Sequence, residues 1–131
     1  MNKELIIKLI DRARESSDNA YCPYTNFPMG CALLVDVNII FTGCNIESRA
    51  LSCSASAGEV AVHKAISEGH TSFKAICFYS TDVMPFPDGR IRDLLSEFSP
   101  MIDIIVAQGE DYSLHTLYEL FPFQPEGPKI E

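Results

Sequence analysis

The sequence predicts an α/β domain of three layers, in which helices cover both faces of a mixed β-sheet. The chain has 131 residues, which suits one core, so residues 1–131 are expected to form a single domain. Its hydrophobic content of 47% argues against disorder. Segments with helical periodicity alternate with short apolar runs, and this order implies right-handed crossovers and a covered sheet.

Charge and hydropathy exclude several classes of protein. The formal net charge is −8 and the isoelectric point is about 4.7, which disfavours binding to nucleic acid. No apolar run reaches the ~18 residues that a membrane span needs. Charges interrupt residues 1–19 throughout, which is not the pattern of a secretory signal. A cytoplasmic protein without a membrane or nucleic-acid partner is expected.

The cysteines form no recognisable metal or disulfide pattern. Zinc sites usually gather two cysteines within a few residues of each other, and this chain has no CxxC pair. Most of its cysteines are therefore predicted to be reduced core residues. The five are Cys22, Cys31, Cys44, Cys53 and Cys77.

A helix and a β-hairpin are predicted for the first third of the chain. Asn2 is the expected helix cap, and apolar residues follow it on one face at helical spacing. The prolines within 22–28 end this helical region. Two apolar runs, 29–36 and 39–45, are then close enough to pair as a hairpin. The apolar helix face comprises Leu5, Ile6, Leu9, Ile10 and Ala13.

A second helix is predicted from about Ala57 to Glu68, with Gly69 as its stop. Residues 73–80 form a continuous apolar run, which is typical of a strand buried on both faces. A third helix is expected over 90–98, a further buried strand over 101–109 and a short closing helix over 116–120. The buried face of the second helix comprises Ala61, Val62 and Ala65.

Several stretches resemble the small, homotetrameric cytidine deaminases. They read "YCPYTNFPMGCALL", "FTGCNIES", "HKAISEGHTSFKAI" and "LLSEF", and the match is nearly collinear from Ala20 to Phe98. The resemblance implies a three-layer α/β/α fold with a mixed, mostly five-stranded sheet. It also implies assembly into a homotetramer, with a dimer as the alternative.

The resemblance places unusual residues at the family's catalytic positions. In that family three His or Cys ligands hold Zn²⁺, which activates water, and a Glu shuttles protons. The ligands stand in Cys-Ala-Glu-Arg and Pro-Cys-x-x-Cys-Arg motifs at the starts of the second and third helices. Here Ser56, Asp88 and Ile91 occupy the three Cys positions, and Gly58 occupies the Glu position. Neither zinc nor ordinary deamination is therefore expected.

Two alternative arrangements would restore part of the site, one the catalytic Glu and the other a metal. A one-residue slip would bring Glu59 to the catalytic position, but it breaks the match that follows and turns the side chain by about 100°. An alternative site built from Asp88, Glu59 and His63 is less favoured than a salt-bridged surface patch. No metal ligands are therefore assigned, and Glu59 and Asp88 remain candidates only for metal-free acid–base chemistry.

Glu59 also stands where the family has an Arg that offsets the charge of the thiolates. Because a buried Arg without thiolates would be an unpaired cation, an acid at this position is reasonable. We expect Glu59 to pair with Arg90 or Arg92 at the start of the facing helix. Ser56 remains a suitable cap for the second helix.

Part of a nucleoside pocket is retained by resemblance. Phe27 corresponds to the residue against the pyrimidine ring, Asn45 and Glu47 to those that bind the ribose hydroxyls, and Ala57 to the first motif's Ala. The competing interpretation is that these residues persist for folding.

Two departures weaken the pocket. Leu51 replaces an aromatic residue often found in the loop before the second helix, and Pro125 stands where the C-terminal tail of the family carries a Phe. Gly127 and Pro128 are displaced by one residue, and Phe123 is a possible substitute for the missing aromatic.

Three functions from different classes follow. The first is a zinc-free, non-deaminating homologue that binds a nucleoside, regulates, or acts as a non-catalytic subunit, including one of a hetero-oligomer with an active paralogue. The second is an enzyme recruited to metal-free chemistry, with Glu59, Asp88, His63 or Cys53 as candidates. The third is a purely structural domain.

Overall fold

The computed structural model describes residues 1–126. The elements, in chain order, are α1 (Lys3–Ser17), β1 (Gly30–Asp36), β2 (Ile39–Cys44), the 3₁₀ helix η1 (Leu51–Cys53), α2 (Ala57–Ser67), β3 (Ala75–Ser80), α3 (Gly89–Phe98), β4 (Asp103–Gln108), β5 (Asp111–Thr116) and α4 (Leu117–Leu120).

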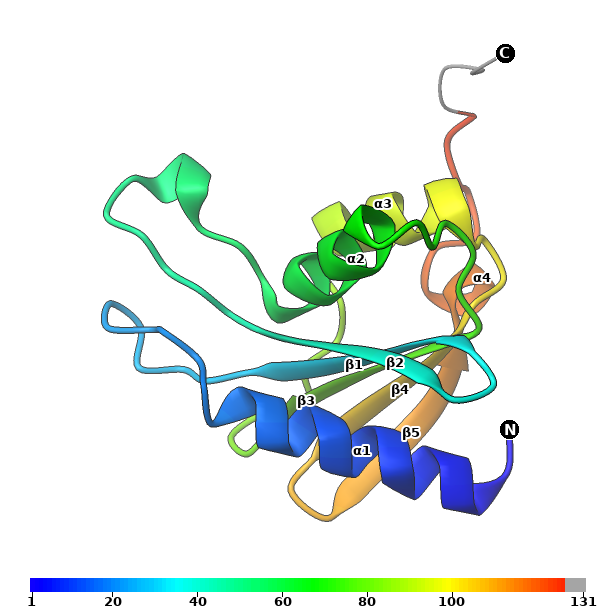
Figure 1. Ribbon diagram of the computed structural model, residues 1–131, viewed down its shortest axis with the longest axis horizontal. Coiled ribbons are helices and arrows are strands. Elements are labelled where there is room, and N and C mark those ends of the chain that lie inside the picture. Colours follow the sequence, from blue (N-terminus) through cyan, green and yellow to red (C-terminus); the bar gives the residue numbers. More distant parts are fainter. Residues whose placement is uncertain (127–131) are drawn as a thin grey trace.

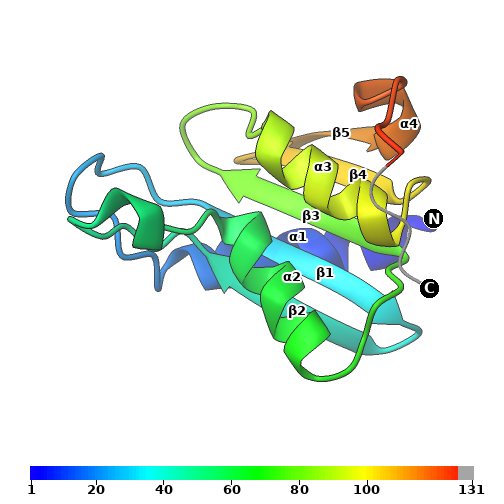
Figure 2. The same cartoon turned by 90° about the horizontal axis from the view of Figure 1, so that it is seen from above.

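The strands form one five-stranded sheet in the order β2-β1-β3-β4-β5. Only β3 and β4 run parallel, and every other neighbouring pair is antiparallel. Helix α1 covers one face of the sheet, and α2 and α3 cover the other (Figure 1). From above, α2 lies over β1 and β2 while α3 lies over β3 and β4 (Figure 2). The predicted three-layer fold with a mixed sheet is confirmed.

Helix α1 begins as the sequence predicts. The side chain of Asn2 accepts a hydrogen bond of 2.8 Å from the Leu5 amide, which satisfies one of the free N–H groups of the first turn. Four of its five predicted apolar residues are buried against the sheet, and Leu5 is half-buried. The apolar spacing therefore fixes which side of the helix meets β1 and β3.

The hairpin and the second helix also match expectation closely. Strands β1 and β2 pair from Gly30↔Cys44 onward. Helix α2 ends at Ser67, one residue before the predicted end, and Gly69 adopts a φ of +93° that favours glycine. The apolar runs that predicted β3 and β4 are buried over most of their length.

Strand β5 has no counterpart among the elements predicted from the pattern, which contained four strands. Its sequence, DYSLHT, has no apolar run, and its residues are exposed or half-buried. It is one of the two edge strands of the sheet, so one long side of its backbone pairs with no strand among residues 1–126. Its position is set by pairing along the whole of β4 rather than by burial of its own side chains.

The five cysteines are free, but only Cys31 and Cys77 belong to the core. Cys53 is exposed on η1, and the remaining two are half-buried. The expectation that most cysteines are core residues was therefore wrong. Cys22 and Cys53 lie in the loops that precede β1 and α2, and Cys44 ends the edge strand β2, where fewer neighbouring elements cover a side chain.

Candidate functional site

The starts of α2 and α3 lie next to each other at one end of the sheet (Figure 2). Each helix has a side-chain cap. Ser56 Oγ accepts from the Glu59 amide at 3.2 Å, and Asp88 Oδ1 accepts from the Ile91 amide at 3.0 Å. These bonds satisfy N–H groups that the helix leaves free. Two residues that resemblance aligns with zinc ligands therefore serve here as caps.

Glu59 connects the two helix starts through polar contacts. One carboxylate oxygen, Oε1, accepts from the Ser56 hydroxyl at 3.2 Å, and the other, Oε2, lies 3.3 Å from Arg90 Nη2. Glu59 is only 7% exposed, whereas the Arg90 side chain is largely exposed. The predicted ion pair is confirmed with Arg90. The network ties the start of α2 to the start of α3.

Arg92, the other cation considered for this pair, holds a different part of the chain. Its Nε donates to the Pro87 carbonyl at 2.7 Å, and its Nη1 donates to the Leu120 carbonyl at 2.8 Å. Arg92 therefore fixes the loop before α3 and the end of α4. Arg90 is therefore the residue of the two that pairs with Glu59.

Gly58 lies in tight contact with Ile91 and Phe78. A Cβ atom added at Gly58 would lie 2.8 Å from Phe78 Cε1 and 2.9 Å from Ile91 Cγ1. Ile91 is 2% exposed, and both it and Phe78 belong to the apolar core between the sheet and the two helices. The space in front of Gly58 is therefore filled by hydrocarbon, and no side chain fits at this position without displacing it.

The other candidate acid–base groups are dispersed. Asp88 is exposed at its capping position, and His63 and Cys53 are exposed on α2 and η1. Within residues 1–126, no three His, Cys, Asp or Glu side chains lie close enough together to hold a metal ion. The alternative combination of Asp88, Glu59 and His63 is thus not brought together in the described part of the chain.

The Asn45 side chain is bonded to the backbone of the segment that carries Phe27. The Asn45 side chain donates to the Phe27 carbonyl at 2.9 Å and accepts from the Met29 amide at 2.9 Å. Asn45 thereby fixes the segment that leads into β1. Phe27 lies half-buried on this segment. One of its N–H groups has no partner in these two bonds.

Glu47 is bonded to the segment before Phe27. Oε2 accepts from the Thr25 hydroxyl at 2.5 Å, and Oε1 accepts from the Tyr24 and Thr25 amides at 3.0 and 3.2 Å. The Thr25 hydroxyl oxygen in turn accepts from the Phe27 amide at 3.2 Å. The Thr25 hydroxyl bond and the two amides hold the pKa of Glu47 below its usual value, because they favour the charged carboxylate.

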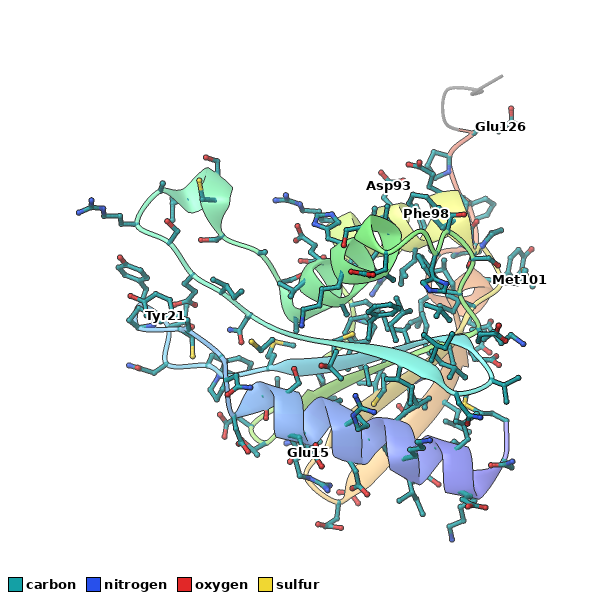
Figure 3. The ribbon with its side chains drawn as sticks, in the orientation of Figure 1. Glu15, Tyr21, Asp93, Phe98, Met101 and Glu126 are labelled. Atoms are coloured by element: carbon teal, nitrogen blue, oxygen red, sulfur yellow. The ribbon has the colours of Figure 1, made fainter. Side chains whose placement is uncertain are left out.

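Two loops project beyond the sheet beside these residues (Figure 1). One precedes β1 and carries Tyr21; the other contains η1 (Figure 3). They are joined by a bridge between Tyr21 and Ile46. Leu51 is 84% exposed on the second loop, and Phe123 is 92% exposed near the C-terminus. Phe123 therefore covers no pocket in the described part of the chain, and Pro125 is likewise exposed.

Three residues named in the sequence analysis remain, Ala57, Gly127 and Pro128. Ala57 is buried at the start of α2. Gly127 and Pro128 lie outside the described residues. Three surface pockets of about 420, 270 and 250 Å³ lie among the described residues, and none of these three is lined by Gly58, Glu59 or Ile91.

Comparison with known proteins assigns a family to this geometry. Residues 3–87 match the model described as the cytidine and deoxycytidylate deaminase zinc-binding region. The chain belongs to this family. A cytidine deaminase of Sporosarcina psychrophila is 40% identical over 92 residues, covering 70% of this chain and 68% of that protein. A probable cytidine deaminase of Dictyostelium discoideum is 36% identical over 124 residues, covering 93% and 84%.

Solved deaminases share the fold. The cytidine deaminase of Burkholderia pseudomallei superposes with a TM-score of 0.85 at 26% identity, over 95% of this chain and 99% of that one. The enzyme of Mycobacterium tuberculosis gives a TM-score of 0.77 at 26% identity, over 90% and 94%. The deaminase-like fold predicted from the resemblance is thus confirmed.

Sequence reasoning missed two residues of this region. Phe78 closes the space in front of Gly58, and Thr25 links Glu47 to Phe27. The buried run 73–80 contained a usable signal, because alternate residues of a strand face the same layer. Thr25 gave a weaker one, since a hydroxyl two residues before an amide often closes a local turn.

Proposed function

We propose that this deaminase-family member is a zinc-free homologue that does not deaminate cytidine and acts as a nucleoside-binding or regulatory, non-catalytic subunit. The contact among Gly58, Ile91 and Phe78 is the observation that supports it most strongly. It places hydrocarbon where the family's proton-shuttling carboxylate would need room.

The groups at the aligned ligand positions do not suit zinc. Ser56 has a neutral hydroxyl that already bonds Glu59, Asp88 caps α3 through one carboxylate oxygen, and Ile91 has no donor atom. A structural or catalytic zinc site needs three or four Cys, His or carboxylate ligands around one point. One carboxylate among these three residues does not meet that requirement, so no step of a reaction is assigned to a metal here.

The magnitude of the loss argues against slow residual deamination. Zinc lowers the pKa of bound water from 15.7 to about 7, so forming hydroxide without it costs about 9 further pKa units, or roughly 12 kcal/mol. General acid–base help contributes about 10²–10⁴-fold more, and Gly58 has no group to supply it.

Nucleoside binding is proposed because the residues at the family's nucleoside-binding positions are retained. Relatives of this chain are named cytidine deaminases, and Phe27, Asn45 and Glu47 are held together by the contacts described above. We propose that Phe27 contacts a pyrimidine ring and that the free N–H of Asn45 and the Glu47 carboxylate bind ribose hydroxyls. We also propose a cytoplasmic homotetramer, in which the projecting loops lie between subunits.

The decisive experiment combines metal analysis, a deamination assay and ligand-dependent unfolding. Purified protein is expected to contain no stoichiometric zinc and to release no ammonia from cytidine at an enzymatic rate. Cytidine or uridine is expected to raise the melting temperature, since binding to the native state stabilises it. Glu47→Gln should weaken that shift. Its matched control is Glu97→Gln, an exposed acid on α3, which should leave the shift unchanged.

Other results would select other functions. Stoichiometric zinc or rapid deamination would overturn the proposal outright. Absence of any nucleoside-dependent shift would leave the purely structural domain. Light scattering during size-exclusion chromatography reports the assembly, and a stable monomer would contradict the tetramer.

A further inference from the structure

A second polar cluster lies on the far edge of the sheet. Ser113 and His115 are two residues apart on β5, so their side chains share one face. They pair with Val106 and Ile104 of β4, which belong to the core beneath α2 and α3. Ser113 and His115 therefore point to the same side of the sheet as α2 and α3, at its β5 edge.

The side chains of this cluster form an ordered series. Ser113 Oγ lies 2.8 Å from His115 Nε2. On the other side of the ring, His115 Nδ1 lies 3.8 Å from an oxygen of Glu119 in α4. This separation is longer than a hydrogen bond, so the carboxylate acts on the ring only through its charge, which favours a proton on Nδ1. In that tautomer Nε2 accepts from the Ser113 hydroxyl. A hydroxyl, an imidazole and a nearby carboxylate thus stand in sequence, the order of a nucleophile, a base and an acidic partner of the base.

The surrounding chain holds these groups in place. The Glu119 amide donates to Thr116 Oγ1 at 3.2 Å, which fixes the start of α4. The ring of Phe86 meets the His115 ring edge-on, with 5.3 Å between centroids. The His115 side chain is 21% exposed, so it is sheltered but still reachable from solvent.

We propose that Ser113, His115 and Glu119 form a hydrolytic site for small activated esters, separate from the deaminase-like region. The Ser113 oxygen attacks the ester carbonyl while His115 Nε2 takes the hydroxyl proton. The ester C–O bond breaks, and the imidazolium returns the proton to the departing alkoxide. Water then cleaves the acyl-serine by the same proton transfers, which releases a carboxylic acid and regenerates Ser113.

The position of the cluster limits the substrate class. Ser113 and His115 are half-buried at an edge strand, and His115 contacts Phe86, which is 46% exposed. A small acyl group on an aromatic alcohol suits this setting, because the ring can lie against Phe86 and the phenolate is a good leaving group. 4-Nitrophenyl acetate and a fluorophosphonate are the probes of choice.

The experiment maps the covalent adduct on the full-length protein. After reaction with the fluorophosphonate, peptide mass spectrometry should place the phosphonyl group on Ser113. Ser113→Ala should abolish that adduct, and His115→Gln should slow its formation by about 10²-fold or more, the usual value of a general base. Glu119→Gln should slow it by about three- to tenfold, because an exposed carboxylate is screened by solvent.

Ser96→Ala is the matched control. Ser96 lies on α3, and its hydroxyl donates to the Asp93 carbonyl at 2.7 Å. This variant should react as the wild type does. Absence of an adduct on Ser113 in the wild-type protein would overturn the proposal, and so would unchanged labelling in His115→Gln. Thermal unfolding of each variant checks that the sheet is intact, and mapping on the wild type needs no variant at all.

Discussion

At Gly58 the sequence shows that a reactive side chain is missing, and the structure shows what fills its space. From the sequence it is a small residue at a position where the family carries a reactive one. In the structure its lack of a side chain admits Ile91 and Phe78, which fill the interior next to the helix start. The residue is therefore fixed by its neighbours, and the consequence can be measured as stability.

Gly58→Ala is expected to destabilise the fold by about 1–3 kcal/mol. The new methyl group would lie under 3 Å from two core side chains, and overpacking of this kind outweighs the gain in helix propensity. Urea unfolding measures the change. Ile91→Val should reduce the cost of Gly58→Ala, because neighbouring sites couple.

Gly89→Ala is the control for that experiment. Gly89 is the first residue of α3, and Gly58 likewise lies in the first turn of α2. A Cβ added at Gly89, however, would meet no neighbouring atom within 4 Å. This variant should be neutral or more stable by up to about 1 kcal/mol. If Gly58→Ala proved as stable as Gly89→Ala, the close fit around Gly58 would be wrong.

The cysteines yield a second residue-scale prediction. Burial raises the pKa of Cys77 to about 12 and that of Cys31 well above its usual value, so neither forms a thiolate at neutral pH. Cys53 is exposed. Iodoacetamide should therefore modify Cys53 first, and Cys31 and Cys77 only after unfolding. Labelling of Cys77 in the native protein before Cys53 would contradict this order.

At the residue scale, the sequence predicted bonds between near neighbours better than contacts across layers. The Ser56 cap and the Glu59–Arg90 pair followed from spacing, helix-end chemistry and the resemblance. The approach of Ile91 to Gly58 did not, because it depends on how closely α2 and α3 settle on the sheet. That distance is set by the whole core rather than by local pattern.

Among the elements, the segment before β1 depends on one side chain from after β2. Glu47 accepts three hydrogen bonds from Tyr24 and Thr25. The Thr25 hydroxyl oxygen also accepts from the Phe27 amide, so Phe27 is held through Thr25. Neither segment belongs to a helix or a strand. The charge of this carboxylate therefore contributes to the order of the loop, beside the Tyr21–Ile46 bridge and the bonds of Asn45.

Acid should release this loop. Since the pKa of folded Glu47 is lowered from its ordinary 4.5, its contribution to stability is present above about pH 4.5 and is lost as the pH falls through the lowered value. Hydrogen exchange at the Thr25 amide should accelerate over that range relative to a distant strand amide. In Glu47→Gln the exchange should be fast at every pH, and an unchanged pH profile would contradict this role.

The elements also show where prediction from pattern ends. Helices α1, α2 and α3 and strands β1 to β4 all carry apolar periodicity or buried runs, and each was predicted within a few residues. Strand β5 carries neither, because an edge strand buries little and takes its register from β4. The fifth strand was expected only through resemblance.

For the whole molecule, two cores on opposite faces of one sheet hold the three layers together. The starts of α2 and α3 are joined by the Glu59–Arg90 pair and by Ile91 against Gly58. Both contacts consist of ordinary side chains. Among the residues described here, the starts of these two helices are therefore in direct side-chain contact. None of the described helices is both long enough and apolar enough to cross a membrane.

Chelation provides the test at this scale. Under the proposed function, excess EDTA should leave the melting temperature within about 1 °C of its starting value, because a metal that does not bind the native state adds no stability. Differential scanning calorimetry with and without chelator measures this. A fall of several degrees, restored by added zinc, would show that a metal holds the helices together.

The fit between Gly58 and Ile91 has a consequence for the evolution of the chain. Two residues 33 positions apart share one volume, so neither can change freely while the other stays. Any relative that carries a larger residue at the first position should carry a smaller one at the second. The pair should accordingly be inherited as a unit, and an intermediate with both large residues should be selected against.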